Sequence, residues 1–247
     1  MRSLGSGKIG LVSVANPGVS IIVPTFREAF NVTALIERTF AALRDFRLPV
    51  EMIVVDDDSQ DGTDAVIQSL QARLSVRLIV RKGERGLSGA VLRGFQEARY
   101  DRFVVLDADL QHPPELIPRF VEKLDAGDCD FVIGTRYAPG GQIEGSWPWH
   151  RRVFSRAATL LARPLMPVSD PMSGFFALRR ETWEQAANLN PIGYKIALEL
   201  YVKCACRRPA EIPITFGLRQ AGASKLSAGV AVRYLQHLLR LYRFRYL

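Results

Sequence analysis

Cysteine is scarce in this chain of 247 residues, which contains only Cys129, Cys204 and Cys206. Three cysteines cannot form the framework of paired disulfides that small secreted domains use. Cys204 and Cys206 lie in an apolar segment with helical character, which favours a packing role over metal binding. This pattern is typical of a protein from a reducing compartment, and we expect a cytosolic location.

Long uncharged apolar runs and a signal-peptide pattern are also missing. No such run reaches the roughly 20 residues that a helix needs to span a bilayer, so we expect no transmembrane segment. The first residues are rich in Gly and Ser and lack periodicity. We interpret residues 1–18 as a flexible N-terminal tail.

Acidic residues are fewer than basic ones, with 25 Asp and Glu against 33 Lys and Arg, which gives a net charge of +8. A positive balance favours anionic partners such as phosphates, lipid headgroups or nucleic acid. The basic residues are scattered, and no aromatic–basic repeat or helix-turn-helix pattern accompanies them. We therefore expect no nucleic-acid partner.

Short apolar runs alternate with amphipathic segments through the first half of the chain. The runs predict strands at Val19–Val23, Val50–Val55, Val76–Val80, Phe103–Leu106 and Phe131–Ile133. The intervening segments predict helices at Asn31–Phe46, Thr63–Leu74, Ser88–Ala98 and Pro114–Ala126. This alternation implies an α/β fold with a mostly parallel sheet flanked by helices, whose ligands bind beyond the carboxyl ends of the strands.

The second half is less regular and ends in an amphipathic segment. We expect helices at His150–Leu165 and Tyr194–Cys206 and strands at Phe175–Leu178 and Glu211–Phe216. In the C-terminal helix, Gly229–Leu247, helical spacing predicts a polar face of Arg233, Gln236, His237, Arg240 and Arg243. The opposite face contains Val232, Leu235, Leu238, Leu239 and Tyr242. A membrane-interfacial helix and a helix packed on the domain or on a partner are both open at this point.

Polar residues follow four of the predicted strands, and the most informative are Asp107 and Asp109. Two carboxylates directly after a buried strand are costly unless a positive charge accompanies them. Mg²⁺ or Mn²⁺ is a natural candidate, because it takes one or two protein carboxylates and completes its shell with water and substrate phosphates. Gln111 adds a neutral oxygen on the same side of the turn as Asp109.

The other strand ends offer further polar groups. The acidic loop Asp56–Asp61 suits recognition of a base or ribose, although Asp58 and Asp61 are equally suited to local turns or to capping the next helix. Arg136, at the end of a strand, suits a phosphate or sugar contact or a surface salt bridge. Asp170 suits a sugar hydroxyl, a basic neighbour or the cap of its own turn.

Five motifs, taken together and in order, resemble family 2 glycosyltransferases of GT-A fold, and more narrowly the dolichol-phosphate mannose synthases. The motifs are Ile22–Glu28, Val55–Ser59, Asp107–Pro114, Gly134–Tyr137 and Asp170–Phe175. Glu144–Trp147 and Ser224–Leu226 strengthen the narrower resemblance, which extends from about Val19 to Leu226. It implies a catalytic domain over residues 19–228, followed by the amphipathic helix at 229–247.

This resemblance implies metal-dependent, inverting transfer of mannose from GDP-mannose to a dolichyl or polyprenyl phosphate. It implies that the nucleotide sugar contacts Pro24, Phe26, Glu28, Val55, Asp57, Asp107, Ala108, Asp109, Arg136, Arg219 and Lys225. Asp109 and Gln111 are the implied ligands of Mg²⁺ or Mn²⁺. Arg151 and Ser155 match positions that hold the acceptor phosphate, and Asp109, Arg136, Arg151 and Ser155 form the implied catalytic set.

The lipid acceptor implies a protein on the cytoplasmic face of a membrane, and whether a separate membrane subunit is needed stays open. Phe26 and Arg27 stand where this family usually has Tyr and Asn, which leaves a UDP-glucose-dependent polyprenyl-phosphate glucosyltransferase as an alternative. A nucleotidyltransferase is disfavoured, because its Gly-rich triphosphate loop is absent after the first strand. The intact carboxylates also disfavour a non-catalytic nucleotide-sugar-binding subunit.

Overall fold

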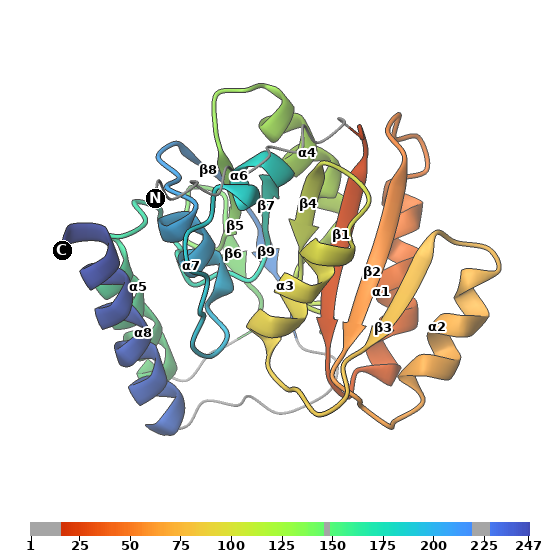
Figure 1. Ribbon diagram of the computed structural model, residues 1–247, viewed down its shortest axis with the longest axis horizontal. Helices are drawn as coiled ribbons and strands as arrows, with labels where there is room; N and C mark the ends of the chain where they lie inside the picture. The colour runs from red at the N-terminus through yellow and green to blue at the C-terminus, as the bar shows by residue number, and fades with distance from the viewer. Residues whose placement is uncertain (1–15, 146–148, 219–227) are drawn as a thin grey trace, which may run out of the picture.

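The computed structural model describes residues 16–145, 149–218 and 228–247, and its described strands form two sheets (Figure 1). The large sheet contains β1 (Val19–Thr25), β2 (Val50–Asp56), β3 (Val76–Val80), β4 (Arg102–Val105), β5 (Phe131–Thr135), β7 (Phe176–Arg179) and β8 (Pro209–Pro213). The small parallel sheet pairs β6 (Gln142–Ile143) with β9 (Thr215–Phe216). The expected mostly parallel α/β fold is confirmed.

The large sheet has the order β3-β2-β1-β4-β7-β5-β8. β1 pairs in parallel with both β2 and β4, and β5 pairs in parallel with β8. β7 is inserted antiparallel between β4 and β5. Because two antiparallel pairings restore the original direction, the carboxyl ends of β1, β2, β4 and β5 all point to the same edge of the sheet.

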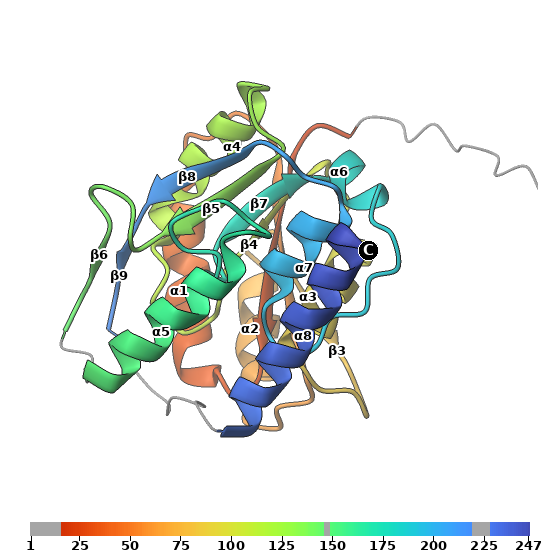
Figure 2. The same ribbon diagram turned by 90° about the vertical axis from the view of Figure 1, so that its left-hand side faces the viewer.

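Helices cover both faces of this sheet (Figures 1 and 2). They are α1 (Ala29–Ala42), α2 (Thr63–Gln71), α3 (Leu87–Glu97), α4 (Ile117–Asp125), α5 (Trp149–Ala162), α6 (Arg180–Glu184), α7 (Ile196–Lys203) and α8 (Ala228–Tyr246), with a 3₁₀ turn η1 at Pro114–Leu116. One buried cluster joins the sheet to α1, α2 and α4, and a second joins it to α3 and α7.

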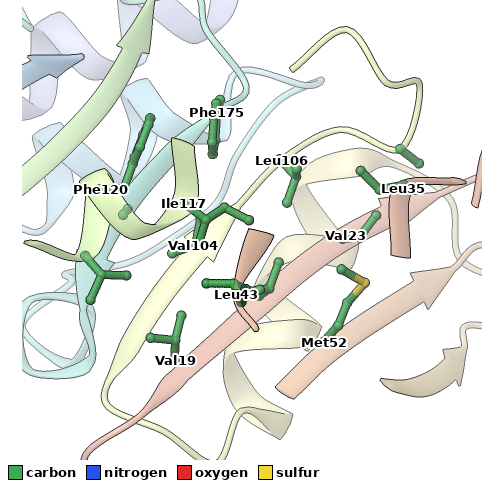
Figure 3. Close-up of a cluster of buried hydrophobic side chains, with 14 of the residues drawn as sticks. Val19, Val23, Leu35, Leu43, Met52, Val104, Leu106, Ile117, Phe120 and Phe175 are labelled. Carbon is green, nitrogen blue, oxygen red and sulfur yellow. The ribbon is translucent and has the colours of Figure 1, made fainter. Parts of the chain in front are cut away.

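The first cluster shows how the sequence periodicity produces this arrangement (Figure 3). β1 turns Val19, Ile21 and Val23 to this face, at the period of two that a strand requires, and all three are fully buried. The aromatic rings of Phe120 and Phe175 stack on the same side with their centroids 4.1 Å apart. Apolar burial at this face therefore fixes the register of β1, and with it the polar loop that follows the strand.

Several predicted boundaries are corrected. Two short elements, β6 and α6, were not expected, and the strand predicted at Glu211–Phe216 is divided into β8 and β9, which belong to different sheets. Before β1, the backbone N–H of Asn16 donates to Oδ2 of Asp101. Residues 1–15 lie outside the described residues.

The polar face predicted for the C-terminal helix was wrong at one important residue. His237, expected among the polar residues, is buried, and its Nε2 lies 2.7 Å from Oε2 of Glu199 on α7. Leu238 and Leu241 are buried beside it, whereas Val232, Leu235 and Leu239 are exposed. A specific partner on α7 explains the difference, because it pairs with a histidine that periodicity alone assigns to solvent.

Cysteines behave as expected from the composition. All three are buried and unpaired. Burial raises the pKa of the Cys204 thiol to about 12, and it also raises the pKa of Cys129 and Cys206. The described residues contain no group of three or more His, Cys, Asp or Glu side chains that is placed to bind a metal ion. The packing role predicted for Cys204 and Cys206 fits these findings.

Gly94 provides a test of the close packing between α3 and β1. A Cβ at this position would lie 2.5 Å from Cγ2 of Ile22, which is closer than side chains pack. We expect Gly94→Ala to lower the free energy of unfolding by about 1 to 3 kcal/mol, measured by urea denaturation. Ala normally stabilises a helix relative to Gly, so the direction of the change is diagnostic.

The matched control for this packing is Gln96→Ala on the exposed side of the same helix. That substitution should change the free energy of unfolding by no more than about 0.5 kcal/mol. A Gly94→Ala variant that is more stable than the wild type contradicts the packing described for α3.

Candidate functional site

The turn after β4 carries the carboxylates of Asp107 and Asp109. Asp107 is partly exposed, whereas Asp109 and Gln111 are buried. Leu110, between them, has a φ of 62°, in the left-handed region that residues other than Gly rarely adopt. In this strained turn the backbone N–H of Gln111 donates to Oδ1 of Asp109 at 3.2 Å, which orients the Asp109 carboxylate.

The chemistry of Asp109 and Gln111 fits a hard divalent cation. Nε2 of Gln111 donates to the carbonyl oxygen of Gly217 at 2.9 Å, and the N–H of Gly217 donates to the carbonyl oxygen of Gln111 at the same distance. These contacts orient the amide through its nitrogen. The amide oxygen and the Asp109 carboxylate are donors of the kind that Mg²⁺ and Mn²⁺ take, so the two side chains would suit such an ion, with the rest of its shell left to water and phosphate.

A buried ion pair joins the end of β5 to the turn before β7. Nε and Nη2 of Arg136 donate to the two carboxylate oxygens of Asp170 at 2.6 and 2.9 Å. The Asp170 side chain is fully buried, and that of Arg136 is 10% exposed. Burial alone would lower the pKa of Arg136, but the two contacts with Asp170 raise it. Asp170 therefore orients a basic partner, one of the roles expected for it.

Gly174 and His112 border Asp107. A Cβ on Gly174 would lie 2.7 Å from Oδ2 of Asp107, so only glycine lets the backbone approach this carboxylate. His112 is buried between the rings of Phe175 and Phe216. Burial lowers the pKa of His112, although Asp107 and Asp109 raise it in part. The neutral His112 imidazole therefore does not compensate the negative charge of Asp107 and Asp109.

The ends of β1 and β2 form a second part of the site. Pro24 and Val55 are paired in register and buried. The Phe26 ring, which follows β1, faces the guanidinium groups of Arg27 and Arg85 at 5.2 and 4.8 Å from its centroid. Glu28 is the N-cap residue of α1 and accepts a hydrogen bond from Nδ2 of Asn31. An aromatic ring with cationic neighbours beside a carboxylate suits a polar, planar base.

Asp57 is held by the loop that follows β3. Its carboxylate lies 3.0 Å from Nη1 of Arg81 and accepts a 2.7 Å hydrogen bond from the N–H of Gly86. Burial raises the pKa of Asp57, and the contacts with Gly86 and Arg81 oppose that effect. Asp57 is thus fixed in orientation at the sheet edge.

Asp61 has a local role in the same acidic loop. It accepts hydrogen bonds from the hydroxyl and N–H of Thr63 and from the N–H of Ala29. These bonds overcome the effect of burial and lower the pKa of Asp61. Asp61 therefore has one of the local roles predicted for it, because it makes contacts at the start of α2.

The acceptor side is described only in part. The hydroxyl of Ser155 on α5 lies 2.9 Å from that of Tyr137, the residue after Arg136. Arg136 and Tyr137 also line a cavity of about 230 Å³, together with Gly141, Gln142, Ile143, Gly145 and Arg156. Arg151 is a position on α5 whose side chain lies outside the described residues, as do the whole of Arg219 and Lys225.

Four charged or ionisable side chains of the site were not identified from the sequence: Arg81, Arg85, His112 and Lys195. Lys195 precedes α7, and its Nζ donates to the carbonyl oxygen of Met172 at 2.7 Å. A single lysine at the start of the apolar segment Ile196–Val202 was a signal for an interior charge. The contact of Arg81 with Asp57 and that of Arg85 with the Phe26 ring join separate loops, so the local sequence does not indicate them.

The chain is similar to several known proteins. Residues 20–185 match the family model described as glycosyl transferase family 2. The chain is 47% identical to a dolichol-phosphate mannosyltransferase of Mycosarcoma maydis, over 97% of this chain and 84% of the relative. It is also 47% identical to a dolichol-phosphate mannosyltransferase of Saccharomyces cerevisiae, over 92% of this chain and 88% of the relative. A polyprenol monophosphomannose synthase of Mycolicibacterium smegmatis is 35% identical, over 92% and 87%.

Among solved structures, glucosyl-3-phosphoglycerate synthase from Mycobacterium tuberculosis, in complex with Mn²⁺, UDP and glucosyl-3-phosphoglycerate, has a similar fold. The TM-score is 0.66 at 21% sequence identity, and the match covers 93% of this chain and 80% of that one. At this identity the match concerns the fold alone, and it confirms the expected GT-A architecture.

The buried ion pair leads to a prediction about stability. Asp170→Ala should leave a buried guanidinium without its carboxylate and lower the free energy of unfolding by about 3 to 5 kcal/mol, measured by urea denaturation. The control is Glu115→Ala, which removes the half-exposed contact with Arg38 and should cost no more than about 1 kcal/mol. Equal effects of the two substitutions contradict the importance given to the Arg136–Asp170 pair.

Proposed function

Because this chain belongs to glycosyl transferase family 2, we propose that it transfers mannose from GDP-mannose to a dolichyl or other polyprenyl phosphate, with inversion at the anomeric carbon. The main support is the 47% identity to two fungal dolichol-phosphate mannosyltransferases over nearly the whole chain. The geometry agrees, because carboxylates, a buried arginine and an aromatic ring meet at one edge of the sheet.

The guanine end of the donor is assigned to the ends of β1 and β2. Pro24 and Val55 form a buried floor there, and Phe26 offers its ring for stacking. Glu28 and Asp57 provide carboxylates that accept hydrogen bonds from ring N–H and amino groups. Asp57 is already fixed by Arg81 and Gly86, so little side-chain entropy is lost when a base binds.

The diphosphate is assigned to Asp107, Ala108 and Asp109, with Asp109 and Gln111 as the residues that would hold Mg²⁺ or Mn²⁺. When bound, such an ion supplies positive charge that stabilises the leaving nucleoside diphosphate. Arg136 lies near Asp107, and the attraction between their opposite charges stabilises the charged form of both side chains. Arg219 and Lys225 are assigned to phosphate binding from the resemblance of their motif.

The site has to bring two anions together, the donor diphosphate and the acceptor phosphate, and the reaction does not require a general base. An acceptor phosphate is already anionic near neutral pH, so its oxygen attacks the anomeric carbon in line with the departing diphosphate. Arg136, Arg151 and Ser155 are assigned to hold that phosphate. The Asp170 carboxylate fixes the Arg136 guanidinium in advance, so its charge needs no reorganisation during the reaction.

The acceptor lipid requires a membrane surface close to the site, and α5 and α8 are the elements we assign to it. The two helices run side by side (Figure 2), and the hydroxyls of Tyr234, Tyr242 and Tyr246 donate to carbonyl oxygens of Ala158, Leu161 and Pro164. Aliphatic side chains between 49% and 63% exposed lie on both helices: Val153, Leu160 and Leu161 on α5, and Val232, Leu235 and Leu239 on α8.

Exposed arginines accompany this apolar surface on α8, namely Arg233, Arg240 and Arg243. Apolar side chains flanked by basic ones suit the interface of a membrane with anionic lipids. None of the helices in the described part of the chain combines the length and apolar character that a bilayer crossing needs. We assign the protein to the cytoplasmic face of a membrane as a peripheral protein, with a separate membrane subunit as a further candidate partner.

Loss of the assigned metal ligand should abolish transfer. We expect Asp109→Ala to lower the rate of mannose transfer from GDP-mannose to a polyprenyl phosphate by about a hundredfold or more at saturating Mg²⁺, because the metal contributes several kcal/mol to the transition state. The assay follows radiolabelled mannose into the organic phase. Asp64→Ala, on the exposed first turn of α2, is the control and should transfer at the wild-type rate.

Transfer by Asp109→Ala at the wild-type rate refutes the ligand assignment. An inactive wild type, assayed with both Mg²⁺ and Mn²⁺, contradicts the proposed function itself.

The membrane assignment predicts the effect of two substitutions on α8. Leu235→Asp combined with Leu239→Asp should lower sedimentation with vesicles of anionic lipid by at least about tenfold, because two exposed leucines no longer enter the interface. Point substitutions are preferable to deletion of residues 229–247, which would also remove the buried His237 and Leu241.

Phe30→Asp is the control for this experiment, since Phe30 is 77% exposed and belongs to α1, not to α5 or α8. It should sediment with vesicles as the wild type does. Unchanged sedimentation of the α8 variant counts against the assignment.

A further inference from the structure

Lys195 is a charged residue close to the proposed transfer site, and it is not among the residues assigned to the donor, the metal or the acceptor. It immediately precedes α7, and its Nζ donates to the carbonyl oxygen of Met172 at 2.7 Å. Met172 lies within the turn Asp170–Gly174, so the ammonium group is bonded to the middle of that turn. A charge-assisted bond of this kind is about twice as strong as one between neutral groups.

The turn that Lys195 holds carries two contacts with the proposed site. At one end, Asp170 binds Arg136 through both carboxylate oxygens. At the other end, the backbone of Gly174 lies directly against the Asp107 carboxylate. A shift of the turn therefore moves both the arginine and the border of the carboxylate at the same time.

The surroundings of Lys195 connect it electrostatically to the same groups. Burial and the charge of Arg136 lower its pKa to about 8, while Asp170 and Asp107 oppose that change. Another close neighbour is the Tyr194 ring, whose centroid lies 4.6 Å from Nζ. With this pKa, roughly 90% of the Lys195 side chains are charged at pH 7, and roughly 10% at pH 9.

The helix that follows Lys195 is firmly anchored. Seven of its eight residues are buried, from Ile196 to Val202. One turn along, the Glu199 carboxylate accepts hydrogen bonds from the N–H of Asn190 and from Nζ of Lys203, and it lies 2.7 Å from Nε2 of His237. The backbone of Lys195 is therefore held in place by contacts independent of its own side chain.

We propose that Lys195 is a positioning residue of the transfer site: its ammonium group holds the turn that orients Arg136 and borders Asp107, and it adds positive charge where the diphosphate binds. This inference rests on the proposed function. A diphosphate brings further negative charge to a cluster that already contains the carboxylates of Asp107, Asp109 and Asp170. The charged form of Lys195 therefore favours donor binding. Loss of the Lys195 proton at alkaline pH weakens the binding of the donor.

The test is the pH dependence of kcat/KM for GDP-mannose in the full-length protein, which reports groups of the free enzyme. For the wild type, we expect kcat/KM to fall about tenfold between pH 7 and pH 9 as Lys195 loses its charge. Lys195→Met should start about tenfold or more below the wild type at pH 7 and should lose most of this dependence. Lys195→Arg keeps a positive charge, and it should retain more activity than Lys195→Met and vary little over the same range.

Lys203→Met is the matched control, because it removes another buried lysine of α7 that contacts Glu199 instead of the Asp170–Gly174 turn. It should lower the melting temperature and keep the alkaline fall of the wild type. If Lys195→Met does not fold, the wild-type and Lys195→Arg profiles decide the question.

Two results overturn the proposal for Lys195: a wild-type kcat/KM that does not change between pH 7 and pH 9, or an alkaline fall that persists unchanged in a folded Lys195 variant. Both leave mannose transfer by the wild type intact. An inactive wild type contradicts the proposed function instead, so the two failures are distinguishable.

Discussion

The Arg136–Asp170 ion pair holds together two parts of the chain that are 34 residues apart, and most of the proposed site is arranged around it. Burying a lone guanidinium is expensive, so the carboxylate has to be present and correctly oriented before the arginine can occupy the sheet edge. The antiparallel strand β7, which follows the Asp170 turn, makes this possible by returning the chain between β4 and β5. The Asp107 carboxylate and the turn that carries Gly174 then meet beside the pair.

A transferase of this kind has to solve a problem of charge. A diphosphate donor and a phosphate acceptor repel each other, and carboxylates at the strand ends add to that repulsion unless cations balance them. Within the described residues, Arg136 and Lys195 supply fixed positive charge near Asp107, and Asp109 with Gln111 offers oxygen ligands for a divalent ion. His112 is buried and its pKa is lowered, so it contributes little to this balance.

The sequence predicted the α/β fold and the proposed diphosphate turn because both depend on local patterns. Alternating apolar residues specify β1, and paired carboxylates after a buried strand specify the turn at Asp107. Features that depend on contacts between distant segments could not be obtained in this way. The insertion of β7, the partner of Arg136 and the burial of His237 against Glu199 each join residues more than 30 positions apart. The apolar segment after Lys195 signals an interior charge, but the sequence does not reveal its partner, because Met172 lies in another turn.

Donor discrimination by the wild-type protein tests the proposed function most directly. GDP-mannose and UDP-glucose, each radiolabelled in the sugar, are incubated with the full-length protein, Mg²⁺ and a polyprenyl phosphate, and the label extracted into the organic phase is counted. We expect label in the lipid phase from GDP-mannose, and only when both the metal and the polyprenyl phosphate are present. Label from UDP-glucose alone, or transfer that continues without the metal, would contradict the assignment of this site to metal-dependent mannose transfer.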